Sequence, residues 1–547
     1  MRHGGQILVD QLKAEGVDRV FHVPGESFLA ALDGLHASGV DVVNCRQEGG
    51  ATMMAEADGK LTGRPGIAFV TRGPGATNAS SGVHVAFQDS TPMVLFVGQV
   101  GSDMMDREAF QEVDYRRMYA PLAKWVAQIE TPERIPEYVS HAFHTAMGGR
   151  PGPVVLALPE TMLSSEASVA TAPPSNPAVA EPSDGLVRRV VDMLRGAERP
   201  LVAVGGPGWS DETARTLAAF AAASDIPVAC TLRCQDYIDN RVPQAVGDMG
   251  VAISPSLKKV VSEADVVLVV GARLGEMTTQ AYTLFEVPEP VQTLVHVYPA
   301  GDEIGRVYRA DLPIVSASGP FIAALAAAWP GGPTPWGAWT RAAREGYEAW
   351  VRPKETPGSV KLEEVVAHLS RTLPEDAIVT NGAGNYCGWV HRYYQYKSWR
   401  TQLAPTSGSM GYGLPAAIAA KLRHPDRTVV AFAGDGCFQM TCQEFGTAMQ
   451  TGAAVVTIIA DNGMYGTIRM HQERHYPGRP SGTQLKNPDF ARWAEAYGGF
   501  GATVRDGATF ADAFDEAVAS GRPAVLHLHT DPDALSTGLR LSAMAAG

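Results

Sequence analysis

Two polar segments in the last third of the chain have residue types and a spacing that suit a metal ion bound to a phosphate. Asp435 stands between Gly434 and Gly436 at the end of an apolar run, and Asn462 follows the next apolar run. The glycines let the backbone turn sharply and approach a ligand closely. A carboxylate, an amide carbonyl and a main-chain carbonyl suit Mg²⁺, which keeps its other positions for phosphates and water. Turns without a ligand are the alternative interpretation.

These residues need strands that end at one edge of a sheet. Both apolar runs are typical of strands, and successive strands of a parallel sheet commonly lie side by side, so Asp435 and Asn462 would emerge together. Thr441 and Glu444 have the spacing of a capping box, which predicts that a helix begins after the first strand. The amides at its start could face an anion.

Short apolar runs alternate with helical patterns throughout the 547 residues. Continuous apolar runs are typical of strands buried on both faces, and their alternation with helices is typical of parallel βαβ units. We therefore predict an α/β protein with three doubly wound parallel-sheet domains. The predicted strands are DVVNC, GIAFVT, PMVLFVG and PVVLAL, then PLVAVGG, PVACTL, VVLVVGA and TLVHVY, and finally AIVTN, TVVAFAG, AVVTIIA and AVLHLH.

Two stretches rich in Pro, Gly, Ser or Ala and without apolar periodicity divide the chain. The second of them contains a short Trp-rich helix candidate. They predict an N-terminal domain at 1–165, a linker at 166–186, a central domain at 187–330, a linker at 331–360 and a C-terminal domain at 361–547.

The composition restricts the partners and the compartment. A formal net charge of −13 argues against binding to nucleic acid and against adhesion to an anionic membrane. No apolar run approaches the ~18–20 residues of a membrane span, and the N-terminus lacks the apolar core of a signal peptide. The six cysteines form no CxxC pair, which excludes zinc-site spacing and fits free thiols in a reducing cytosol. We expect a cytoplasmic protein.

The GDG segment followed by Asn resembles the thiamine diphosphate motif. The segment GIAFVTRGPGATNASSGVHVAFQDSTPMVLFVGQV closely resembles the cofactor-facing domain of acetolactate synthase, and the likeness spans nearly the whole chain. The resemblance implies that Asp435, Asn462 and the carbonyl of Met464 hold Mg²⁺, which bridges the diphosphate. The further cofactor-binding residues that it implies are Pro24, Gly73, Ala383, Gly384, Asn385, Tyr386, Gly408, Met410, Gly436, Cys437 and Gly466.

Gly411–Ala416 also match GxGxxA, a fingerprint of dinucleotide binding. A lone match is a weak signal, and the residues before it make a poor strand. The family resemblance instead places Met410 under the bend between the two rings of the cofactor and gives the carbonyl of Gly408 to the aminopyrimidine. Ordinary core packing of Met410 is the alternative.

The resemblance assigns the activating acid to Glu48, which follows the strand DVVNC and precedes a helix predicted from Ala51. In similar enzymes a glutamic acid hydrogen-bonded to N1′ of the pyrimidine promotes the imino tautomer, which removes the proton from C2 of the thiazolium. Without the resemblance, a carboxylate at a helix N-terminus is an ordinary partner of the helix dipole. Similar enzymes build each active site from two subunits, which implies a homodimer or a homotetramer.

Five residues are implied to lie on the substrate side. Phe110, Gln111 and Lys124 agree with the family pattern, and Lys124 could attract a carboxylate. Ser27 lies in the HVPGES loop, where similar enzymes contact substrate. His471 replaces a tryptophan that tunes the choice of acceptor and could shuttle protons, with a surface or structural role as the alternative.

The predicted function is decarboxylation of a pyruvate-like 2-oxo acid with transfer of the acyl unit to an acceptor. Met277 replaces an Arg that holds the carboxylate of the second substrate in acetolactate synthases, so an aldehyde or ketone acceptor is expected. A simple decarboxylase, an acetyl-transferring lyase and a non-catalytic relative that binds a nucleotide or flavin stay open as alternatives. Tyr298 and Ala300 replace aspartates that commonly contact flavin, which argues against FAD binding but leaves it open.

Overall fold

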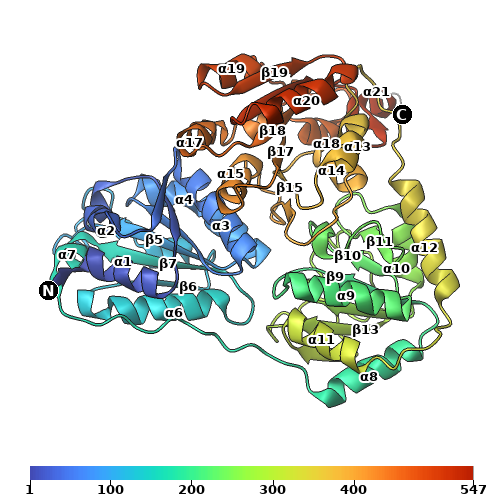
Figure 1. Cartoon of the computed structure of the whole chain (residues 1–547), viewed down its shortest axis with the longest axis horizontal. Helices are drawn as coiled ribbons and strands as arrows, with labels where there is room; N and C mark the ends of the chain where they lie inside the picture. The colour runs from blue at the N-terminus through green and yellow to red at the C-terminus, as the bar shows by residue number, and fades with distance from the viewer. Residues whose placement is uncertain (546–547) are drawn as a thin grey trace.

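The computed structural model of the chain describes residues 1–545. Its strands form three six-stranded sheets of parallel strands with helices between them, which confirms the predicted fold class (Figure 1). We call them the first, second and third units, in chain order. Among the described residues, no helix is both long enough and apolar enough to cross a membrane.

The first unit carries Glu48. Its sheet has the strands β2 (Arg19–His22), β3 (Asp41–Asn44), β4 (Gly66–Val70), β5 (Met93–Gln99), β6 (Trp125–Gln128) and β7 (Pro153–Pro159), in the order β3-β2-β4-β5-β7-β6. The helices are α1 (Gly4–Ala14), α2 (Leu29–Leu35), α3 (Glu48–Thr62), α4 (Pro74–Asp89), α5 (Tyr115–Tyr119), α6 (Ile135–Met147) and α7 (Glu160–Ser164). A short antiparallel pair, β1 (Arg2–His3) and β8 (Glu166–Ala167), closes the unit. The central strands β4, β5 and β7 are buried throughout, as their mainly apolar sequences predict.

The second unit has the sheet order β11-β10-β9-β12-β13-β14. Its strands are β9 (Pro200–Val204), β10 (Val228–Cys230), β11 (Ala245–Asp248), β12 (Val266–Val270), β13 (Thr293–Tyr298) and β14 (Leu312–Val315). Its helices are α8 (Asp184–Arg195), α9 (Asp211–Ser224), α10 (Pro255–Glu263) and α11 (Ser318–Ala328). The Trp-rich helix candidate forms α12 (Gly337–Trp350), which packs against α10 and β11. Residues 168–183, before this unit, form neither helix nor strand.

The third unit has the sheet order β16-β15-β17-β18-β20-β19. Its strands are β15 (Ile378–Asn381), β16 (Gln402–Leu403), β17 (Val429–Gly434), β18 (Val456–Asp461), β19 (Phe500–Val504) and β20 (Ala524–His529). Its helices are α13 (Leu362–Thr372), α14 (Cys387–Tyr393), α15 (Gly413–Arg423), α16 (Asp435–Phe438), α17 (Phe445–Thr451), α18 (Gly466–His475), α19 (Phe490–Ala496) and α20 (Phe510–Ala519). The pair β21 (Ala534–Ser536) and β22 (Leu539–Arg540) and the helix α21 (Leu541–Ala545) follow.

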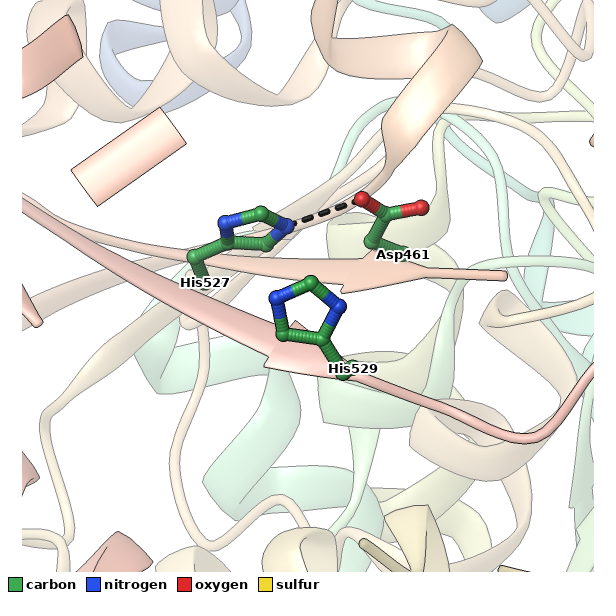
Figure 2. Close-up of side chains that lie close together, drawn as sticks. All are labelled: Asp461, His527 and His529. Atoms are coloured by element: carbon green, nitrogen blue, oxygen red, sulfur yellow. Dashed lines mark hydrogen bonds and ion pairs between the residues drawn. The ribbon is translucent and has the colours of Figure 1, made fainter. Parts of the chain in front are cut away.

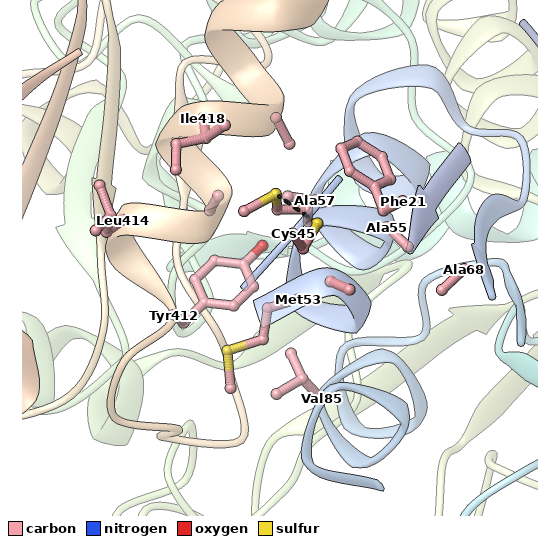
Figure 3. Close-up of a cluster of buried hydrophobic side chains, with 14 of the residues drawn as sticks. Phe21, Cys45, Met53, Ala55, Ala57, Ala68, Val85, Tyr412, Leu414 and Ile418 are labelled. Carbon is pink, nitrogen blue, oxygen red and sulfur yellow. Dashed lines mark hydrogen bonds between the residues drawn. The ribbon is translucent and has the colours of Figure 1, made fainter. Parts of the chain in front are cut away.

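The first and third units share one hydrophobic core. Helix α3 packs between α4 of its own unit and α15 of the third unit. Met53 of α3 and Val85 of α4 belong to the same buried cluster as Tyr412, Leu414 and Ile418 (Figure 3). The helix that begins at Glu48 is therefore held by both units.

Candidate active site

A cavity of about 260 Å³ lies at the carboxyl ends of β15, β17 and β18. Gly434 of β17 pairs with Ala460 of β18, so Asp435 and Asn462 reach the same edge, as predicted. The strand order reverses between β15 and β17, which is where sheets of this type bind ligands. The cofactor-binding residues predicted in this unit all line the cavity: Ala383, Gly384, Asn385, Tyr386, Gly408, Met410, Asp435, Gly436, Cys437, Asn462, Met464 and Gly466.

Glycines shape this cavity. A Cβ atom on Gly408 would meet no heavy atom within 4 Å, so this residue borders open space. A Cβ atom on Gly436 would lie 2.5 Å from the ring of Tyr465, which only glycine avoids. Met410 is half-buried and packs against the core of the third unit, so its position at the cavity agrees both with the predicted wedge and with core packing.

Asp435 is buried, with 2% of its surface exposed, and begins α16. The amide of Asn487 donates hydrogen bonds to Asp435 Oδ2 and to Asp461 Oδ1, each at 2.7 Å. Burial raises the pKa of Asp435 to about 6; the Asn487 hydrogen bond opposes this shift, and the charge of Asp461 adds to it. A cation bound to this carboxylate would compete with its proton.

Asp461 ends β18 and faces two histidines of β20 (Figure 2). His527 Nε2 lies 2.8 Å from Asp461 Oδ2, and the ring centroids of His527 and His529 are 4.3 Å apart. Burial alone would raise the pKa of Asp461, but hydrogen bonds from His527 and the Gly463 amide lower it to about 2. The three residues could each offer one ligand atom within 4.8 Å of the others. Because the carboxylate already accepts these hydrogen bonds, we interpret the group as a support that keeps Asp461 ionised.

Two side chains brace the turns around the cavity. The hydroxyl of Tyr386 accepts a hydrogen bond from the Gly382 amide at 3.0 Å and lies 3.3 Å from Cys437 Sγ. The Gly411 amide donates to the same sulfur at 3.2 Å. These contacts join the turn after β15 to the turn after β17 and hold the two turns together.

Glu48 is buried and is the first residue of α3, which begins three residues before the predicted start at Ala51. Asn78 Nδ2 donates to Glu48 Oε2 at 3.0 Å. Gly73 adopts a φ of 61° before α4, a conformation that suits glycine. Within residues 1–545, the first unit supplies no residue to the 260 Å³ cavity, so neither Glu48 nor Gly73 nor the exposed Pro24 lines it.

The predicted capping box of Thr441 and Glu444 is wrong. Thr441 Oγ1 donates instead to the Gly411 carbonyl at 2.5 Å, and the next α-helix, α17, begins after Glu444. The Glu444 carboxylate accepts hydrogen bonds from the backbone amides of Arg46 and Gln47 in the first unit. Two main-chain donors of another unit thus replace the one donor that a capping box would offer.

The five predicted substrate-side residues do not gather in the cavity within the described chain. Ser27 is fully buried, and its Oγ is hydrogen-bonded to Thr71 Oγ1 at 2.8 Å. Phe110 is 74% exposed, and Gln111 next to it has a φ of 66°. The Lys124 ammonium donates to a carbonyl at the end of α6 at 2.7 Å, and burial with a neighbouring arginine lowers its pKa to about 8. His471 is exposed on α18.

A larger cavity of about 790 Å³ lies where residues of all three units meet. Gly206 and Gly208 after β9, and Arg273 after β12, line it at the point where the strand order of the second sheet reverses. Met277 also lines it and is 43% exposed. Tyr298, at the end of β13, is fully buried and is absent from this lining.

Sequence reasoning missed the residues that support the predicted ligands. His527 and His529 had a signal, because residues two apart on a strand share a face. Asn487 had no such signal, and Glu444 was predicted only as part of a capping box. The contacts of both residues join distant parts of the sequence: Glu444 meets residues nearly four hundred positions earlier.

Three stretches match family profiles of thiamine pyrophosphate enzymes: the N-terminal TPP binding domain over residues 2–118, the central domain over 187–325 and the C-terminal TPP binding domain over 382–528. The acetolactate synthase large subunit of Corynebacterium glutamicum is 32% identical over 90% of this chain and 81% of its own length. The isozyme 3 large subunit of Escherichia coli is 30% identical over 92% and 90%, and the Haemophilus influenzae large subunit is 31% identical over 92% and 89%. The chain therefore belongs to the thiamine pyrophosphate enzyme family, in its acetolactate synthase-like group.

Proposed function

We propose that this protein is a carboligase that uses thiamine diphosphate and Mg²⁺ to decarboxylate a pyruvate-like 2-oxo acid and join the acyl unit to an acceptor. The observation that carries the proposal is one cavity that gathers the turns after β15 and β17, the carboxylate of Asp435 and the amide of Asn462. The similarity to acetolactate synthase large subunits supports the same reaction class.

The donors at the cavity fit the ion and the diphosphate. Asp435, Asn462 and the carbonyl of Met464 would hold Mg²⁺ and leave positions for phosphate oxygens and water. Gly408, with open space where a side chain would be, and Met410 border the room left for the rings. When bound, thiamine diphosphate supplies an electron sink for the electrons left by departing CO₂.

Glu48 of a second subunit would complete this site. Asn78 donates a hydrogen bond to Glu48 Oε2, and Oε1 accepts no hydrogen bond within the described chain. Oε1 is therefore available to hold a proton against the pyrimidine nitrogen. Because the first unit of the same chain lines none of the described cavity, we propose a homodimer at least, with a homotetramer of two dimers as the full assembly.

The acceptor is proposed to be an aldehyde or ketone. Met277 carries no charge with which to bind a second carboxylate, and it lies in the larger cavity. FAD is left out of the proposed cofactors because Tyr298 at the end of β13 and Ala300 just after it offer no carboxylate to a flavin. The six cysteines are free and five are buried, which supports a cytoplasmic location.

The test is incubation with Mg²⁺, thiamine diphosphate and a panel of 2-oxo acids, with and without aldehydes, followed by mass spectrometry. A coupled hydroxyketone is expected. Free aldehyde alone would favour a simple decarboxylase, and a product that requires added phosphate would favour an acetyl-transferring lyase. The proposal would be ruled out if calorimetry detects no binding of thiamine diphosphate, or if a chelator of Mg²⁺ does not change that binding.

A further inference from the structure

A buried carboxylate of the third unit contacts the backbone just before Glu48. Glu444 is 0% exposed. Its Oε1 accepts a hydrogen bond from the Gln47 amide at 2.9 Å, and both of its oxygens lie 3.2 Å from the Arg46 amide nitrogen. These two donors directly precede α3, whose first residue is Glu48.

Residues of both units make room for, or hold, the Glu444 carboxylate. A Cβ atom on Gly50 would lie 2.4 Å from Glu444 Oε1, so glycine there lets the carboxylate reach the helix start. Thr447 Oγ1 donates to Glu444 Oε2 at 2.7 Å, and the Arg46 guanidinium reaches back to Gln450 Oε1 at 2.7 Å. The carboxylate is thus held within its own unit while it binds the other.

Within the described chain, the carboxylate of Glu48 makes one hydrogen bond, with Asn78. Asn78, which bonds Glu48 Oε2, stands on α4 of the same unit and is exposed. Burial raises the pKa of Glu444, while hydrogen bonds from Thr447 and the backbone amides oppose this shift. A buried carboxylate with main-chain donors is a directional anchor, because its removal leaves those donors unpaired.

We propose that Glu444 is a positioning residue for catalysis: through the amides of Arg46 and Gln47 it fixes where Glu48 presents its carboxyl group. This inference rests on the proposed function, in which Glu48 activates the cofactor of a partner subunit. A misplacement of ~1 Å in such a group can reduce a rate by about 10²-fold. Loss of Glu444 should therefore slow activation of the cofactor without weakening its binding.

Four variants test this role. Glu444→Met keeps the length of the side chain and removes both acceptor oxygens, whereas Glu444→Gln keeps one acceptor oxygen. Gly50→Ala perturbs the contact from the other side, which keeps the test valid if Glu444→Met does not fold. Tyr412→Phe is the matched control: it removes a 2.5 Å hydrogen bond between the third unit and Glu56 of the same helix, away from its start.

The first measurement needs no cofactor. Hydrogen–deuterium exchange of the backbone at 46–50 should quicken by about 10-fold or more in Glu444→Met and Gly50→Ala, because the helix start loses its anchor. Glu444→Gln should stay near the wild type, and Tyr412→Phe should leave these amides unchanged. Unchanged exchange at 46–50 in both disrupting variants would overturn the proposal.

The second measurement uses the holoenzyme loaded with Mg²⁺ and thiamine diphosphate. NMR after acid quench follows the exchange of the C2 proton of the bound cofactor for deuterium. The rate should fall by about 10–100-fold in Glu444→Met, while the Kd for the cofactor stays within about two-fold of wild type. Equal C2 exchange in wild type and Glu444→Met would refute the role of Glu444 alone. A wild-type protein that binds no thiamine diphosphate would refute the proposed function itself.

Discussion

Mixing two inactive variants tests whether one active site takes residues from two chains. Glu48→Gln keeps the shape of the side chain beside Asn78, so cofactor binding should persist while turnover falls by about 10²-fold or more, as for other lost acid/base groups. Asp435→Ala removes the buried carboxylate that would hold the metal, so Mg²⁺-dependent retention of thiamine diphosphate should be lost.

The activity recovered on mixing follows from the composition of each site. In a mixed dimer, one site combines the intact Glu48 of one chain with the intact Asp435 of the other, and both substitutions fall in the second site. Random pairing makes half of the dimers mixed, so activity should return to about a quarter of the wild-type level. Each parent variant alone should retain about 1% or less, so the recovery is easily measured.

The assay co-expresses the two variants with different affinity tags and purifies the mixed dimer over both tags. Hydroxyketone formation per chain should then reach about half of the wild-type value, because one of two sites is intact. Wild type mixed with Glu48→Gln controls for effects of the tags. Mixed dimers as inactive as their parents would mean that each site lies within one chain, and would refute the reasoning.

Three further outcomes are expected. Met277→Arg places a cation in the larger cavity and should improve use of a 2-oxo acid acceptor over an aldehyde by about 10–100-fold, which corresponds to the ~1.5–3 kcal/mol of a charged hydrogen bond. The ratio of products formed when the two acceptors compete measures this change. An unchanged ratio would place the acceptor elsewhere. Gly436→Ala would bring a Cβ atom within 2.5 Å of the Tyr465 ring and should weaken cofactor binding measured by calorimetry, whereas unaltered affinity would contradict the described turn. Burial, helped by Arg233, lowers the pKa of His391 to about 3, so the folded state keeps it neutral while the unfolded chain is protonated below its ordinary value of about 6.5. The stability that neutral His391 contributes is therefore fully present above pH ~6.5 and has fallen by about 2 kcal/mol at pH ~5. In denaturant unfolding, His391→Gln should lose less free energy of unfolding over this pH range than the wild type does. Equal losses in the two proteins would contradict this role of His391.

Most interior strands could be predicted from the sequence, whereas β2 and most edge strands could not. The mainly apolar runs of β4, β5, β12 and β18 reflect burial on both faces. β14, at the edge of the second sheet, alternates buried and exposed residues, and β19, at the edge of the third sheet, is mostly half-buried. Edge strands need less apolar sequence because one side has no neighbouring strand, so their signal is weaker.

The prediction that Asp435 and Asn462 reach the same sheet edge needed only one local rule. Asp435 and Asn462 each follow a strand, and parallel pairing of β17 with β18 alone brings them together. The capping box failed because a local spacing rule cannot foresee a stronger distant donor. Thr441 and Glu444 have the right types and separation, yet Glu444 bonds to amides of the first unit.

By itself, the sequence determined which residues stand at the carboxyl ends of strands, and so which could bind a metal ion, a diphosphate or a proton. Only the tertiary structure decided what holds them: Asn487 between Asp435 and Asp461, and Glu444 beneath the start of α3. The physical reason is the distance along the sequence over which each kind of interaction acts. Strand and turn patterns depend on neighbouring residues, whereas a buried polar group takes whichever donor the packed units bring to it.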